Sequence, residues 1–145
     1  MLPFTVDAAH PRGIKLVEML HRRHWTPEQA NELLPIVGAT VRRVRDARRR
    51  LADEGFDTEF SERAEASGGG WPGREHAEAS VEIALGLACL DRLDIVVRDL
   101  ERGLVDFPAM RDGREVYLCW LLDEPAVGHW HGIETGFAGR RPLEA

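Results

Sequence analysis

The sequence has few of the features of a secreted or membrane protein. Only two of its 145 residues, Cys89 and Cys119, are cysteines, which is too few for a disulfide framework. Both lie in apolar stretches, so we interpret them as buried small side chains in a reducing compartment and expect a cytoplasmic location. No apolar run approaches the roughly 18 residues of a membrane span, and charged residues interrupt residues 1–25 where a signal peptide would be apolar. We therefore expect neither secretion nor membrane insertion.

Sequence motifs of several common enzyme classes are also missing. No GxSxG or GxGxxG pattern occurs, and Gly68-Gly69-Gly70 lacks the following Lys and Ser or Thr of a phosphate-binding loop. Neither cysteine has a histidine near it in the sequence, and apolar surroundings raise the pKa of a thiol and make it inert. The sequence assigns no catalytic residue and leaves enzymatic activity uncertain.

What is present is the composition of one globular domain. Hydrophobic residues make up 43% of the chain and charged residues 30%, which is enough apolar surface for a core. We divide the chain into an N-terminal arm, residues 1–24, and a single domain, residues 25–145. Helical spacing of apolar residues in the arm predicts a short helix from about residue 13 to residue 24, with Ile14, Val17 and Leu20 on its apolar face.

Two long helices are predicted to follow. The first begins with Thr26 as a cap, Pro27 in the first turn and Gln29 completing a capping box, and its apolar face continues to about residue 65. A glycine-rich connection, residues 67–73, separates it from a second helix over residues 74–100. The apolar stripe of the second helix is too broad for one neighbour. The pattern therefore predicts an antiparallel helical hairpin whose second helix also packs against the C-terminal part or against another copy.

A change to strand-like patterning follows Gly103. Residues 104–107 and 115–121 flank the turn signal Asp112-Gly113, and residues 126–131 can return as a third strand. We predict an α+β fold in which the helical hairpin precedes a small C-terminal antiparallel sheet of two to three strands. Both faces of the predicted strand at residues 115–121 are apolar, so we expect both faces of the sheet to be covered. We expect residues 135–142 to wrap around the sheet.

Charge is divided unevenly along the chain. Residues 1–50 carry a net charge of +5 and the remainder −11, and six arginines fall between Arg42 and Arg50. Such a helix could neutralise nucleic-acid phosphates. The net negative charge of the chain and the lack of a recognition-module signature favour a solvated or intramolecularly paired face, so we consider nucleic-acid binding unlikely.

Several blocks of sequence resemble a family known only as a bacterial domain of unknown function, DUF2203. The resemblance covers about residues 25–143, and its motifs are Trp25-Thr26-Pro27-Glu28-Gln29-Ala30-Asn31-Glu32-Leu33-Leu34-Pro35, Arg102-Gly103-Leu104-Val105-Asp106-Phe107-Pro108-Ala109, Val116-Tyr117-Leu118-Cys119-Trp120, and the segment from Trp130 to Arg140. The resemblance implies a helical hairpin followed by a small β region. It implies no activity.

A pair of histidines is the main candidate site. His129 and His131 are two apart on a predicted strand, so their rings share a face and can reach one ion. With Glu134 and Asp106 they could form a set of ligands for Zn, Mn or Fe. The alternative is that these histidines are packed, hydrogen-bonded residues. His21 and His24, beside two arginines, are a weaker pair.

Arg140 has two interpretations. It could form a small anion pocket with glycine amides, or it could pair with Asp106 or Glu134 and fix the tail to the sheet, which we favour.

Three functional hypotheses remain. The first is a non-enzymatic oligomeric scaffold or interaction protein, with a homodimer as the simplest assembly. The second is a divalent-metal protein, which could be an enzyme, using His129, His131, Glu134 and Asp106. The third is nucleic-acid binding through the Arg42–Arg50 face.

Overall fold

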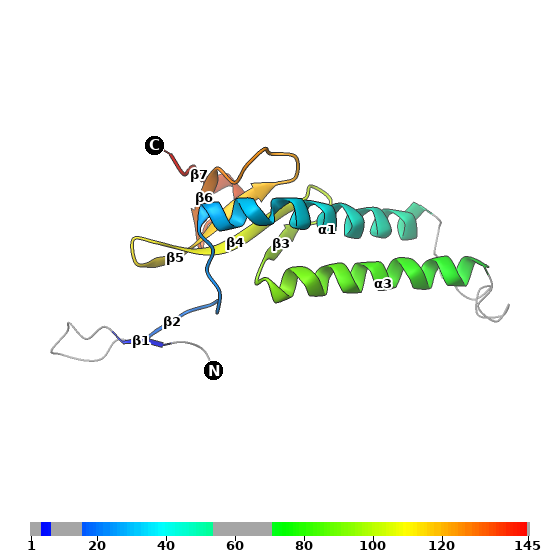
Figure 1. Cartoon of the computed structure of the whole chain (residues 1–145), viewed down its shortest axis with the longest axis horizontal. Coiled ribbons are helices and arrows are strands. Elements are labelled where there is room, and N and C mark those ends of the chain that lie inside the picture. The colour runs from blue at the N-terminus through cyan, green and yellow to red at the C-terminus, as the bar shows by residue number, and fades with distance from the viewer. Residues whose placement is uncertain (1–3, 7–15, 54–70, 145) are drawn as a thin grey trace.

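The computed structural model describes residues 4–6, 16–53 and 71–144. Two long helices, α1 (Pro27–Asp53) and α3 (Trp71–Arg92), lie side by side in opposite directions, and an antiparallel sheet sits at one end of the pair (Figure 1). The sheet has the order β3-β4-β5-β6-β7, with bounds Val96–Asp99, Leu104–Arg111, Arg114–Leu121, His129–Gly132 and Arg141–Pro142. The α+β class is therefore confirmed, but the sheet has five strands where two to three were predicted.

Among the described residues, no helix combines the length and apolarity needed to cross a bilayer.

The start of α1 follows the predicted capping box. The amide of Gln29 donates to Thr26 Oγ1 at 3.1 Å, and the amide of Thr26 donates to Gln29 Oε1 at 3.0 Å. These two bonds satisfy amides that the first helical turn leaves without partners. The portion of the expected first helix beyond Asp53, together with most of the glycine-rich connection, lies outside the described residues.

The end of α3 differs from the prediction of a helix reaching residue 100. The helix stops at Arg92, and Asp94 adopts a left-handed backbone conformation with φ of 56°. The amide of Ile95 donates to the carbonyl of Leu90 at 3.0 Å, and that of Asp94 donates to Asp91 at 2.9 Å, which is a Schellman arrangement. The β-branched run that follows then forms β3 instead of a helical turn.

The hairpin between β4 and β5 forms at the predicted turn. Asp112 and Gly113 have φ angles of 52° and 75°, as a two-residue type I′ turn requires, and Arg111 pairs with Arg114. The two further strands were missed because β3 lies inside a helix-like apolar stripe and β7 has only two residues.

One face of the sheet packs against the helices. Alternate side chains of β4 and β5 join the inward side chains of α1 and α3 in a core that includes Ala30, Val37, Val41, Leu90, Val105, Phe107, Val116, Leu118 and Trp120. Trp25 packs against this core, and its indole Nε1 donates to the carbonyl of Leu93 at 3.0 Å. The helices thus cover one face and leave the opposite face for other residues.

The helix predicted for the arm is wrong over residues 16–24, where no helix forms. Residues 16–18 are instead strand β2 (Leu16–Glu18), which pairs antiparallel with β1 (Phe4–Val6) in a separate two-stranded sheet. Farther on, the amides of Leu20 and His21 donate to the Glu115 carboxylate. A single turn or two of isolated helix is not stable by itself, so these partners for the backbone amides decide the conformation.

A close approach between α1 and α3 provides a test of this packing. A Cβ atom added at Gly86 would lie 2.2 Å from Val44 Cγ2. We expect Gly86→Ala to lower the free energy of unfolding by about 1–3 kcal/mol through overpacking, although alanine favours helix by about 1 kcal/mol. Urea unfolding monitored by circular dichroism measures the change.

Two variants control this experiment. Gly86→Ala introduced into a Val44→Ala background should cost nothing, because the clashing methyl group is gone. Gly38→Ala, whose Cβ meets its nearest atoms at 3.4 Å, should not destabilise the protein. Equal unfolding midpoints for wild type and Gly86→Ala would show that the helices do not approach as described.

Candidate functional site

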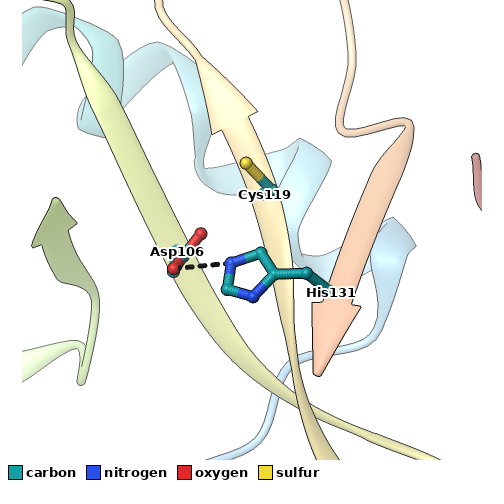
Figure 2. Close-up of side chains that lie close together, drawn as sticks. All are labelled: Asp106, Cys119 and His131. Atoms are coloured by element: carbon teal, nitrogen blue, oxygen red, sulfur yellow. Dashed lines mark hydrogen bonds and ion pairs between the residues drawn. The ribbon is translucent and has the colours of Figure 1, made fainter. Parts of the chain in front are cut away.

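The face of the sheet opposite the helices carries buried polar side chains. Asp106 on β4, Cys119 on β5 and His131 on β6 point to one another across three adjacent strands (Figure 2). In the strand register Asp106 is opposite Cys119, and Tyr117 is opposite His131. Asp106 and Cys119 are fully buried and His131 is 3% exposed. Strand pairing thus places Asp106 and Cys119 side by side, and His131 joins them from the neighbouring pair on the same face of the sheet.

The ring of His131 lies between two hydrogen-bond acceptors. Its Nδ1 is 2.8 Å from the carbonyl oxygen of Gly132, and its Nε2 is 2.9 Å from Asp106 Oδ2. A carbonyl oxygen can only accept, so Nδ1 carries a proton. In a neutral ring Nε2 then presents its lone pair to a carboxylate. A hydrogen bond across this contact needs one proton, carried by the ring or by the carboxyl, and a metal ion bound by both side chains would replace that proton.

Asp106 has one bonded and one unbonded oxygen. Arg98 Nε donates to Oδ2 at 2.7 Å, the same oxygen that faces His131, while Oδ1 is buried and has no hydrogen-bond partner among the described residues. Arg98 reaches Asp106 from a β-bulge in β3, where the register shifts between Val97 and Asp99. A buried carboxylate oxygen without a partner is costly, so Oδ1 is a position where a ligand would be stabilising.

Cys119 completes the cluster. One potential ligand atom from each of Asp106, Cys119 and His131 lies within 4.8 Å of the other two. Burial and the charge of Asp106 raise the pKa of the Cys119 thiol to about 11, against the opposing effect of Arg140. The thiol is therefore protonated at neutral pH, and the His131 nitrogen on its far side is engaged by Gly132, so the three residues do not form an activated cysteine nucleophile.

A pocket of about 300 Å³ opens onto the cluster. Its walls are the sheet residues Arg98, Leu104, Asp106, Cys119 and His131, and the segment 133–137. Phe137 lies between two guanidinium groups, with Arg102 at 4.8 Å and Arg140 at 4.6 Å from its ring centroid. These contacts hold residues 133–137 over the sheet, as expected for a wrapping tail.

The predicted ligand set is only half assembled. The structure brings His131 and Asp106 together, but the nearest acid to His129 Nδ1 is Glu124, at 3.7 Å. Glu134 lines the pocket without joining the cluster. Arg140 pairs with Glu124 at 2.8 Å, so the expected pairing with Asp106 or Glu134 is wrong. Glu124, the observed partner of Arg140, lies 16 residues before it, in the segment between β5 and β6.

Both cysteines are free thiols. Cys119 is buried as predicted, but its neighbours are charged side chains instead of an apolar core. Cys89 is only partly buried, on the surface of α3. Alternation along β5 could have indicated that Cys119 shares a face with His131. The register with β6 places His129 opposite Cys119 and His131 opposite Tyr117, so the proximity of Cys119 and His131 follows from where their side chains point.

The arginine-rich face of α1 is largely paired within the chain. Arg42 pairs with Asp123, Arg49 with Glu101, and Arg50 with Glu82. All three pairs are exposed, so each stabilises the fold by about 0–1 kcal/mol. Their acidic partners come from α3 and from the turns of the sheet, which agrees with the attraction expected between the two halves of the chain.

A second polar cluster fixes the segment before α1. Glu115 accepts hydrogen bonds from the amides of Leu20 and His21, at 2.9 and 3.0 Å, and lies 2.7 Å from His24 Nε2. His21 Nε2 is 2.7 Å from the hydroxyl of Tyr117. We call Glu115, His21 and His24 the arm clasp. The two histidines considered weak ligand candidates thus contact a carboxylate and a phenol of β5.

Comparison with protein families assigns the chain to one of them. The chain matches the family described as Uncharacterized conserved protein (DUF2203) over residues 23–143, and it belongs to that family. The resemblance seen in the sequence is therefore confirmed. Searches of curated proteins and of solved structures found no match.

The arm clasp has an expected pH dependence. Burial raises the pKa of Glu115, but its bonds with His24 and with the amides of Leu20 and His21 outweigh burial and hold the pKa below its usual value of 4.5. A lowered pKa contributes stability that is fully present above pH 4.5 and is lost as pH falls through the folded-state value. We expect Glu115→Gln to lose this stability at neutral pH and to flatten the acid limb of the stability profile.

Urea unfolding at pH 7 and at a series of pH values below 4.5 measures this effect. Glu134→Gln, an exposed carboxyl outside the clasp, is the matched control and should keep the wild-type profile. If Glu115→Gln and wild type lose stability in parallel on acidification, the clasp does not contribute.

Proposed function

We propose that this protein binds one divalent transition metal through Asp106, Cys119 and His131. The observation that supports this proposal is the buried Oδ1 of Asp106, which has no hydrogen-bond partner among the described residues and belongs to a cluster whose three potential ligand atoms lie within 4.8 Å of one another. A metal-bound histidine commonly donates its other ring nitrogen to a carbonyl, as His131 Nδ1 does to Gly132. A cation in the cluster would supply the partner that Asp106 Oδ1 lacks.

The donor set narrows the choice of metal. A thiolate, an imidazole and a carboxylate together suit zinc or iron better than manganese, which prefers oxygen ligands. Cys119 would lose its proton on binding, and Arg140, which acts to lower the pKa of that thiol, favours the thiolate. Three protein ligands leave one position toward the pocket, the arrangement of catalytic zinc sites rather than of closed structural ones.

Charge around the cluster is compatible with a cation. Arg98 opposes a positive ion, but it is bonded to Oδ2 and leaves Oδ1 available. Its side chain is 41% exposed, so solvent screens much of its charge. Glu134 at the pocket wall adds a negative charge. The proposed location is the cytoplasm, where a reduced Cys119 remains available as a ligand.

Metal analysis and cobalt binding test this proposal. Protein purified without chelator or affinity-tag metal should carry close to one zinc or iron per chain. Cobalt added to the metal-free protein should give a near-ultraviolet thiolate band that Cys119→Ser abolishes. His131→Ala and Asp106→Asn should weaken cobalt binding at least about tenfold, because each removes a ligand.

The controls use the predicted ligands that the structure places outside the cluster. His129→Ala and Glu134→Gln should bind cobalt within about twofold of wild type. The proposal fails if wild type binds no stoichiometric metal, or if Cys119→Ser and His131→Ala bind as wild type does. Circular dichroism of each variant separates loss of a ligand from loss of the fold.

A second candidate function, a non-enzymatic oligomeric scaffold, has support from a different surface. Large apolar side chains are exposed on the helical hairpin: Ile36 at 56%, Val81 at 55%, Leu85 at 67% and Leu87 at 40%. Ile36 and Leu85 line one groove, Val81 lies one turn before Leu85, and Leu87 lies on another side of α3. A cluster such as that of Ile36, Val81 and Leu85 is typical of a binding surface. We propose a homodimer as the assembly, since a second copy is the simplest partner. Nucleic-acid binding receives no comparable support, because four of the six arginines, including Arg45 with its neighbour Asp46, form ion pairs within the chain.

A further inference from the structure

We infer that one exposed stripe of α3 is the dimer interface; the stripe consists of Glu78, Val81, Leu85, Ala88 and Arg92. It packs antiparallel against the same stripe of a second copy, and the two helices cross at Leu85. The inference rests on the homodimer proposed above and is independent of metal binding. It assigns the partner, the interface and the relative orientation of the two chains.

The apolar part of this surface has both a projection and a groove. Leu85 is the most exposed large apolar side chain among the described residues, at 67%. It forms one wall of a groove of about 360 Å³, whose other lining residues are Leu33, Ile36, Ala88, Cys89, Arg92 and Leu93. Leu85 and this groove together form an apolar surface that a second copy, related by a twofold axis, can cover.

Charge is arranged symmetrically along the same stripe. Residues seven apart on a helix lie two turns away on nearly the same face, and Glu78 and Arg92 are each seven residues from Leu85. Both are exposed. Within the residues that the structure describes, neither forms an ion pair with another side chain. The apolar middle of the stripe therefore lies between Glu78 on one side and Arg92 on the other, with the exposed Arg74 one turn beyond Glu78.

This pattern selects the orientation of a second copy. In an antiparallel crossing at Leu85, Glu78 of each chain lies opposite Arg92 of the other, which gives two equivalent ion pairs. A parallel crossing would place like charges opposite each other at both ends, which is unfavourable. Val81 would then face the small side chain of Ala88, so that the middle of the interface is apolar. Charge complementarity of the stripe with itself is the reason that we assign a second copy as its occupant.

Charge reversal tests the orientation. Wild type should have twice the 16.3 kDa chain mass by light scattering. We expect Glu78→Lys and Arg92→Glu each to weaken dimerisation about tenfold, because each converts two attractive pairs into repulsive ones. An equimolar mixture of the two variants should recover the wild-type dissociation constant. The double variant Glu78→Lys/Arg92→Glu should recover it as well.

Crosslinking tests the crossing point. In a Cys89→Ser background, Leu85→Cys should form a disulfide-linked dimer on mild oxidation, because the two copies of residue 85 meet on the twofold axis. Leu87→Cys is the control: it is also exposed but lies on another side of α3, so it should crosslink far less. Leu85→Asp should reduce dimer affinity at least about 100-fold, without unfolding a protein in which that side chain is exposed.

The possible results distinguish an error in this interface from an error in the homodimer proposal. A wild-type monomer at all concentrations would overturn both. A wild-type dimer that persists in Leu85→Asp, or charge variants that do not recover when mixed, would overturn this interface and leave the homodimer in place. Metal content should be the same in wild type and in every α3 variant, whichever result is obtained.

Discussion

Pairing of β4, β5 and β6 is the constraint on which the rest of the structure depends. Side chains alternate between the two faces of a strand, so a register fixes which of them meet. In the observed register Phe107 is opposite Leu118 on the helical face, while Asp106 is opposite Cys119 on the other face. A shift of one residue would bury the carboxylate against α1 and expose the core to the pocket.

The two faces of this sheet have different kinds of cover. The helical face is closed by apolar side chains, whose burial supplies most of the stabilisation of such a fold. The opposite face is closed by residues 133–137 and by the arm clasp, which use guanidinium–aromatic contacts and charged hydrogen bonds. Buried polar groups on this second face need partners, and that requirement brings the side chains able to bind a ligand together in one cluster.

A buried Asp106 beside a buried His131 is costly to maintain without a role. Arg98 supplies part of the compensation through a β-bulge, but one carboxylate oxygen remains without a hydrogen bond. Features of this kind tend to lie at functional sites, since an apolar pair of similar volume would stabilise the core better. The helical hairpin carries no such cluster within its described parts, residues 27–53 and 71–92. Its distinguishing feature is a stripe of apolar and charged residues suited to a partner.

The sequence by itself determined the elements with strong local signals: the capping box at Thr26, the hairpin turn at Asp112-Gly113 and the two long helices with their antiparallel order. These signals act within a few residues, so they can be read without the fold. Only the tertiary structure decided that residues 96–99 are a strand, that the segment before α1 is held by Glu115, and that Cys119 replaces His129 in the cluster. Each of those outcomes depends on pairing between residues distant in sequence, for which local periodicity carries no information.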